Sequence, residues 1–111
     1  MTHDKSQRIA ELNDLCRKAM GVVGKVYQTP GIAALPADDR SAIREKVETF
    51  DAFTPGNDPY GERDFGAFEY NGNRIIWKID YYDATMESGS EDPSDPEQTI
   101  RFLTIMLASE Y

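Results

Sequence analysis

The chain has 111 residues, 40% of them hydrophobic, and carries a formal net charge of −8. This length predicts a single domain, residues 1–111, which can bury one hydrophobic core without staples. The acidic balance argues against general binding to nucleic-acid phosphates or anionic lipid, because both need a basic face. It permits docking on a basic protein, although for most acidic proteins the charge simply maintains solubility.

The ends of the chain and its cysteine content indicate a cytoplasmic protein. Residues 1–8 lack the apolar segment of a signal peptide, and the longest nearly apolar run, residues 102–108, is too short to cross a bilayer. The single cysteine, Cys16, excludes an internal disulfide, as expected in a reducing cytosol. The only histidine, His3, lies near the N-terminus, which disfavours a histidine-based zinc site or general base.

Two helices and a short strand are predicted in the first half. Helical spacing of apolar residues predicts a helix over residues 4–20, with Cys16 buried and Arg17 among the polar residues of the outer face. Residues 22–29 alternate weakly and predict a strand, followed by a type II turn at residues 29–31. A second helix is predicted over residues 36–50, with Pro36 at its start.

The strongest local prediction is a β-hairpin. Asn71-Gly72 is the preferred pair for a two-residue type I′ turn, and both flanks are rich in aromatic or β-branched residues. Counting outward from this turn pairs Tyr70 with Asn73, Glu69 with Arg74, Phe68 with Ile75, Gly66 with Trp77, Asp64 with Ile79 and Arg63 with Asp80. A slip of one residue would break all of these pairs, so the pattern predicts the register.

The last element is ambiguous. Residues 84–95 form a polar loop whose carboxylates do not match a calcium-binding loop. Asp95, Pro96 and Gln98 then resemble a helix start, so we favour a helix over residues 96–108. The β-branched residues within 99–106 leave a strand open as the alternative.

Acidic and aromatic residues around the hairpin form a candidate binding site. The register points Asp64 toward the core, and a carboxylate there is costly unless it is paired or lines a pocket. The candidate binding residues are Asp58, Tyr60, Glu62, Arg63, Asp64, Trp77, Asp80, Tyr81, Tyr82 and Asp83.

Four of these acids, Asp58, Glu62, Asp64 and Asp83, could converge to bind a divalent cation or to act as a general acid and base. The competing interpretation is structural, because Asn57-Asp58-Pro59 is ordinary turn chemistry and Asp64 can bond nearby amides or an arginine. We assign no catalytic residue, metal or cofactor.

Several long motifs resemble a known family. They read FDxFT at residues 50–54, NDPYGERDFG at 57–66, WKIDYYD at 77–83, GSEDP at 89–93 and LTIMLASEY at 103–111. They are similar to a family of small bacterial proteins catalogued only as a domain of unknown function. Members often carry histidine where this chain has Arg63, so a histidine ligand or base at that position is not expected here. The family resemblance implies an association with plasmids, integrative elements and prophages, and through it a role in countering host defence.

The expected fold is α+β: an antiparallel sheet of three or four strands, built on a central hairpin, with about three helices mainly on one face. The leading functional hypothesis is a non-catalytic acidic binding protein that acts on a protein partner, such as a defence nuclease, in an anti-restriction or anti-CRISPR role. The alternatives are a small metal- or ligand-dependent enzyme that uses the carboxylate cluster and an interaction module that dimerises. We expect no direct binding to nucleic acid or membrane.

Overall fold

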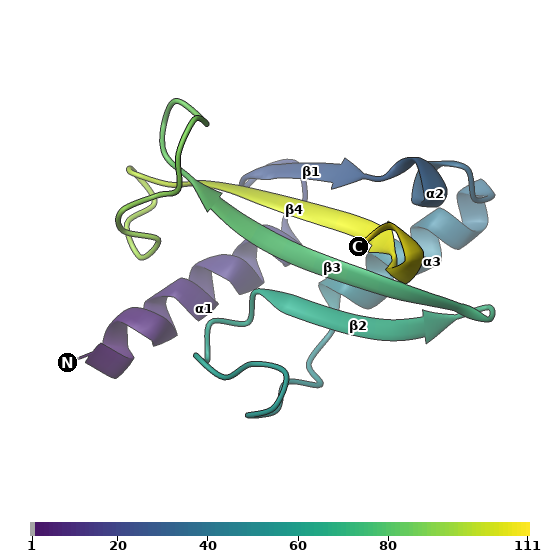
Figure 1. The fold of residues 1–111 in the computed structure, drawn as a ribbon, viewed down its shortest axis with the longest axis horizontal. Helices are drawn as coiled ribbons and strands as arrows, with labels where there is room; N and C mark the ends of the chain where they lie inside the picture. Colours follow the sequence, from purple (N-terminus) through teal and green to yellow (C-terminus); the bar gives the residue numbers. More distant parts are fainter. Residues whose placement is uncertain (1) are drawn as a thin grey trace.

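The computed structural model describes the backbone of residues 2–111 and the side chains of residues 5–111; the His3 side chain lies outside this range. The chain forms a four-stranded sheet, three helices and a final 3₁₀ turn (Figure 1). The elements are α1 (Thr2–Lys18), β1 (Lys25–Gln28), α2 (Pro30–Ala33), α3 (Ala37–Glu48), β2 (Phe65–Tyr70), β3 (Asn73–Tyr82), β4 (Ile100–Leu107) and η1 (Ala108–Glu110). No helix within the described residues is long and apolar enough to cross a membrane.

The strand order is β1-β4-β3-β2. Both β2–β3 and β3–β4 are antiparallel, whereas β1 runs parallel to β4. The α+β class is confirmed, but the sheet is mixed rather than antiparallel throughout. The chain needs a long connection to place β4 beside β1 in parallel, and helices α2 and α3 with the β2–β3 hairpin supply it. The hairpin provides one edge strand and one central strand.

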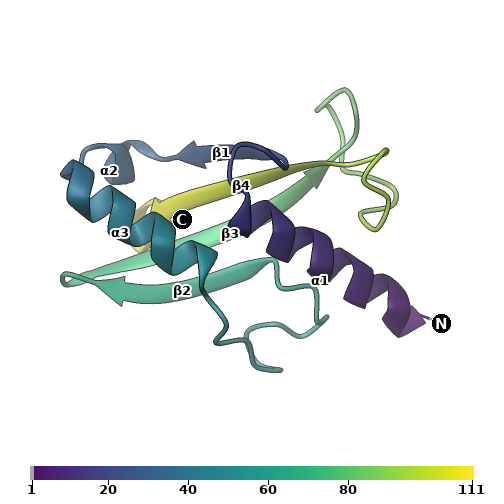
Figure 2. The same ribbon diagram turned by 180° about the vertical axis from the view of Figure 1, so that it is seen from behind.

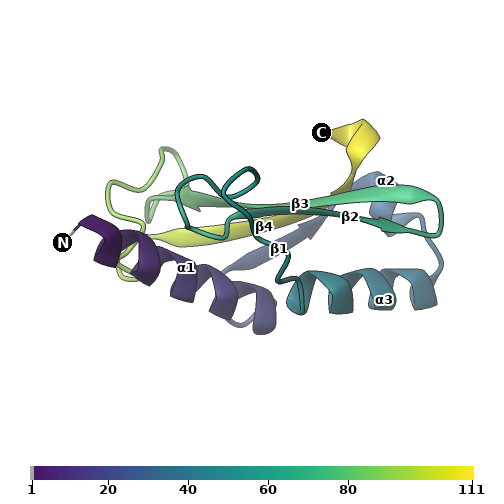
Figure 3. The same ribbon diagram turned by 90° about the horizontal axis from the view of Figure 1, so that it is seen from below.

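Helices α1 and α3 cover the same face of the sheet (Figures 2 and 3). The core lies between them and the sheet, with Trp77 and Leu103 among the fully buried side chains. Cys16 of α1 and Val47 of α3 are also fully buried, as the helical spacing predicted. Burial raises the pKa of the Cys16 thiol above its ordinary value, because the thiolate would lose its hydration.

The predicted hairpin register is confirmed from Phe65 to Tyr70. Asn71 and Gly72 both have positive φ (49° and 79°), as a type I′ turn requires. The Ile79 amide also donates to the Asp64 carbonyl at 2.8 Å, which extends the register by one pair. The pairing between the two strands ends at Asp64, so the predicted cross-strand pair of Arg63 with Asp80 is wrong.

The prediction of a C-terminal helix is wrong, and the strand alternative is confirmed as β4. The Asp95 side chain accepts hydrogen bonds from the Glu97 amide at 2.9 Å and the Gln98 side-chain amide at 2.7 Å. The hydrogen bonds expected at a helix start therefore form, but they stabilise a turn and no helix follows it. The following residues are buried on both faces of the sheet, so their apolar pattern loses the alternation that marks a strand.

The type II turn predicted at residues 29–31 is also wrong, because Pro30 and Gly31 open the short helix α2. The Ala33 amide donates to the Thr29 carbonyl at 2.9 Å, and the Ala34 amide donates to the Pro30 carbonyl at 3.0 Å. The strand predicted before this turn is confirmed in the shorter form of β1.

The other face of the sheet carries no helix. The C-terminal turn η1 folds over part of it (Figure 3). The Tyr111 ring lies 6.0 Å from the Phe65 ring, centre to centre. Glu110 holds this turn, because its carboxylate accepts hydrogen bonds from the Thr29 hydroxyl at 2.6 Å and the Gly31 amide at 2.9 Å. The Thr29 bond is the main reason why the pKa of Glu110 is lowered from its ordinary value.

Candidate functional site

The segment 57–64 leads into β2 through turn chemistry. The Asp58 carboxylate accepts a hydrogen bond from the Arg63 amide at 3.0 Å, and the Asn57 side chain accepts one from the Thr54 amide at 2.8 Å. Arg63 adopts a positive φ of 56°, which turns the chain away from the β3 register. Asp58 is thus part of a turn, as the structural interpretation of the sequence predicted.

Glu62 and Tyr81 belong to a polar network that joins helix α1 to the sheet. The Tyr81 hydroxyl donates to the Glu62 carboxylate at 2.9 Å and accepts a hydrogen bond from the Asn13 amide at 2.8 Å. The Asn13 amide group also donates to the Glu62 carbonyl at 2.9 Å. Arg101 completes the network: its Nε donates to the Asn13 carbonyl oxygen at 2.7 Å, and its guanidinium lies 5.2 Å from the Tyr81 ring centre.

The position of Tyr81 inside this network determines its protonation state. Burial is the largest effect on its hydroxyl and raises the pKa well above the ordinary value of 10.0, and the nearby carboxylates Asp64 and Glu62 add to the increase. Tyr81 therefore stays protonated in the physiological range and serves as a hydrogen-bond donor.

Arg63 pairs with helix α1 instead of β3. Its guanidinium donates to one Asp14 oxygen at 2.7 Å, and Arg17 donates to the other at 2.8 Å. Both arginines lie against the ring of Phe53, at 5.4 Å for Arg17 and 5.7 Å for Arg63. Asp80 instead accepts a hydrogen bond from Lys78 at 2.8 Å on the helix-free face.

Trp77 is fully buried at the centre of an aromatic cluster. Its ring lies 5.6 Å from the Phe50 ring and 6.1 Å from the Phe53 ring, with the Arg17 guanidinium 4.9 Å from its centre. Gly66 leaves the space that the indole occupies. The surrounding contacts are those of packing, so Trp77 supports the site without being open to a ligand.

Asp64 pairs with Ile79 through its backbone, as the register predicted, and is partly buried. Burial is the largest effect on its carboxyl and raises the pKa above the ordinary value of 3.8, and Glu62 and Asp58 raise it further. The ionised carboxylate is therefore less stable in the folded chain than in the unfolded chain.

We expect Asp64→Asn to stabilise the protein at neutral pH. Because the pKa is higher in the folded state, the stability that protonated Asp64 provides is present below about pH 3.9 and is lost as the pH rises through the folded-state pKa. Urea unfolding of both proteins between pH 3 and pH 7 checks this. The two free energies of unfolding should converge at the acid end, and a wild-type protein that is the more stable at pH 7 would contradict the assignment.

The remaining candidate residues lie apart. Asp83 accepts a hydrogen bond from the Thr85 hydroxyl at 2.7 Å in the loop after β3, and this bond is the main reason why its pKa is lowered. Tyr82 lies on the helix-free face against Phe102, and Tyr60 is 78% exposed beside α1. The structure brings Asp58, Glu62 and Asp64 near one another. No group of three histidine, cysteine or acidic residues that could hold a metal occurs in the searched part, residues 5–111.

The sequence interpretation missed the residues that α1 and β4 contribute. Arg17 was expected on the outer face of α1, and Asn13 was assigned no role, yet both are buried. Arg17 reaches across the helix interface and donates to the Val47 carbonyl at 2.8 Å and the Phe50 carbonyl at 2.9 Å. The available signal was spacing: Asn13 and Arg17 directly follow the buried positions Leu12 and Cys16.

Comparison with known proteins places the chain in a family. No curated protein matches the chain, and no solved structure matches it. A family model described as "Protein of unknown function (DUF3768)" matches residues 28–110. The matched segment includes β2, β3, β4 and all ten candidate residues, whereas α1 and all of β1 except Gln28 precede it. The chain therefore belongs to the DUF3768 family of proteins of unknown function.

Proposed function

We propose that the protein is a non-catalytic binding protein that acts on a protein partner through the helix-free face of its sheet. The observation that carries the proposal is the set of aromatic side chains on or against this face, where no helix covers them. They are Tyr27, Phe65, Tyr82, Phe102 and Tyr111. Tyr27 is 47% exposed and Tyr111 is 75% exposed. Tyrosine is enriched among the residues that dominate binding energy at protein interfaces.

The charge of the chain favours a basic partner surface. With a net charge of −8, the protein attracts a cationic surface over a distance of about 8–10 Å at physiological salt. On the face itself, Lys78 and Asp80 neutralise each other. The aromatic rings would therefore supply contact area, while the rest of the surface would supply the attraction.

The alternative, a small metal- or ligand-dependent enzyme, has less support. It would use Asp58, Glu62, Asp64 and Asp83. Three of these carboxylates are already engaged: Asp58 accepts a hydrogen bond from the Arg63 amide, Glu62 from the Tyr81 hydroxyl and Asp83 from the Thr85 hydroxyl. Asp83 lies in a different loop from the other three. An acid held by such bonds is poorly placed to bind a metal or to exchange protons with a substrate.

The finer proposal is a cytoplasmic inhibitor of a host-defence nuclease, carried by mobile genetic elements. Its support is the family resemblance together with the acidic charge, because an acidic inhibitor can present carboxylates where the nuclease would bind phosphates. Dimerisation through the same face is the competing outcome.

The experiment compares two variants in one binding assay. Tyr27→Ser/Tyr111→Ser removes the two most exposed rings of the face. Tyr60→Ser is the control, since Tyr60 is about as exposed as Tyr111 but lies beside α1. Immobilised wild-type protein should retain a basic bacterial protein that the control also retains and the double variant releases. Equal retention by all three proteins, or a concentration-dependent dimer in sedimentation that the double variant abolishes, would contradict the proposal.

The finer proposal needs its own assay. Unmodified phage should plate more efficiently on a restricting or CRISPR-immune host that expresses the wild-type protein than on one that expresses the double variant. Identical plating on both hosts would leave the binding proposal in place and remove the anti-defence role.

A further inference from the structure

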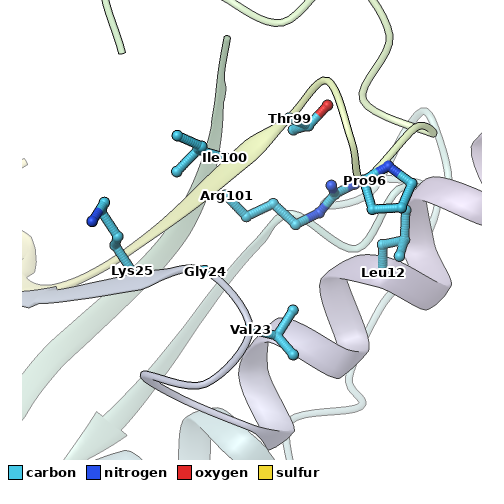
Figure 4. Close-up of a pocket in the computed structure, with 8 residues that line it drawn as sticks. All are labelled: Leu12, Val23, Gly24, Lys25, Pro96, Thr99, Ile100 and Arg101. Carbon is cyan, nitrogen blue, oxygen red and sulfur yellow. The ribbon is translucent and has the colours of Figure 1, made fainter. Parts of the chain in front are cut away.

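A pocket of about 360 Å³ lies where β1 and β4 begin, next to α1 (Figure 4). Its apolar wall comes mainly from Leu12, Val23, Pro96 and Ile100. The side chain of Arg101 runs from β4 toward Pro96 and the Leu12 turn of α1, as Figure 4 shows. A pocket of this size and composition is in the range of small-molecule sites.

Arg101 is a buried cation whose hydrogen-bond partners among the described residues are neutral. It is 4% exposed, and it donates to the Asn13 side-chain oxygen at 2.7 Å and to the Pro93 carbonyl at 2.5 Å. Within residues 5–111, no carboxylate lies within 4.0 Å of its guanidinium, although Arg17 and Arg63 both have such a partner in Asp14. Removing a cation from water is costly unless a counter-charge offsets the loss of hydration.

One nitrogen of this guanidinium remains available. Nε and one terminal nitrogen, Nη2, make the two hydrogen bonds, and Nη1 has no acceptor among the described residues. Nη1 is also not one of the fully enclosed polar atoms without a partner. The described residues therefore neither pair with Nη1 nor fully enclose it, and Arg101 lines the pocket.

The pocket lining also contains no acid, although the protein is acidic. The chain has 20 acidic and 12 basic residues, yet the lining contains Arg101 and Lys25 and no carboxylate. The Lys25 side chain points away from Arg101, as Figure 4 shows, so Arg101 is the cation that faces the pocket. The cleft that holds Arg17 and Arg63 includes Asp14, Glu48 and Asp51. The pocket thus combines a buried guanidinium with an apolar wall and no acid.

We propose that this pocket is a binding site for a small ligand that carries an oxyanion, a carboxylate or a phosphate, on a compact apolar body. The oxyanion would accept a charge-assisted hydrogen bond from Nη1 of Arg101. The apolar body would lie against Leu12, Val23 and Pro96. This site does not depend on the protein-partner proposal.

The test uses the ¹⁵N-labelled full chain and three probes at constant ionic strength. Butyrate offers a carboxylate with an apolar tail, butyramide is its neutral counterpart, and inorganic phosphate is the second oxyanion. We expect saturable shifts of the Gly24, Thr99 and Arg101 amide signals with butyrate or phosphate, on the order of millimolar affinity for probes this small. The tighter of the two probes identifies the ligand as a carboxylate or a phosphate.

Two variants test whether the pocket itself binds the oxyanion. Val23→Glu places a carboxylate in the pocket wall and should weaken oxyanion binding by at least about fivefold, while Val22→Glu, the same charge change at the neighbouring exposed position outside the lining, should leave the affinity unchanged. Arg101→Lys keeps the charge, removes the planar fork and should also weaken binding. The proposal is overturned if neither oxyanion gives saturable shifts, if butyramide binds as well as butyrate, or if Val23→Glu and Val22→Glu have equal effects.

Discussion

Replacing Gly66 with alanine should destabilise the fold by about 3 kcal/mol. A Cβ atom at this position would lie 2.7 Å from Cε2 and 2.9 Å from Cζ2 of Trp77, closer than non-bonded carbon atoms approach each other. The indole has no room to move, because it is fully buried against Phe50, Phe53 and Arg17. In a strand without such a clash, alanine is more stable than glycine by about 0.5–1 kcal/mol. A loss of stability in Gly66→Ala would therefore be due to the clash.

Urea unfolding measures this effect, with Gly56→Ala as the control. Gly56 is exposed and its added Cβ would have no neighbour closer than 3.7 Å, so its free energy of unfolding should stay within about 0.5 kcal/mol of wild type. Trp77→Phe creates a cavity by itself, but it should relieve the clash in a double variant with Gly66→Ala. Strictly additive losses would show that the glycine does not exist to accommodate the indole.

Replacing Asn13 with alanine should cost about 3 kcal/mol or more. The change leaves the Arg101 Nε, the Tyr81 hydroxyl and the Glu62 carbonyl each without one hydrogen-bond partner. One of these groups is a buried cation, for which the loss is largest. The loss occurs although alanine is the stronger helix former.

Gln7→Ala is the matched control, because it removes an exposed amide from the same helix. Its stability should stay within about 0.5 kcal/mol of wild type. A double-mutant cycle with Tyr81→Phe should give a coupling free energy of about 0.5–3 kcal/mol, since the Asn13 amide and the Tyr81 hydroxyl share one hydrogen bond. If Asn13→Ala and Gln7→Ala unfold alike, the network that joins α1 to the sheet is not formed.

The candidate site was only partly predictable from the sequence. The pairing of Asp64 with Ile79 follows from the hairpin register, which depends on residues near in sequence. The register does not predict the partners of Glu62 and Arg63. Asn13 lies 49 positions from Glu62, and Asp14 lies 49 positions from Arg63. Arg101 lies 88 positions from Asn13. A local pattern contains no information on which buried polar group meets which across such distances.

The sequence by itself determined the two long helices and the hairpin with its register, because these depend on local spacing and on the Asn71-Gly72 turn. Only the tertiary structure decided that residues 100–107 form a strand, since pairing with β1 on one side and β3 on the other overrides a local helix signal. It also decided that Asn13, Arg17 and Arg101 lie inside the fold. Polar groups are stable there only where distant partners satisfy their hydrogen bonds, and the three-dimensional arrangement alone supplies those partners.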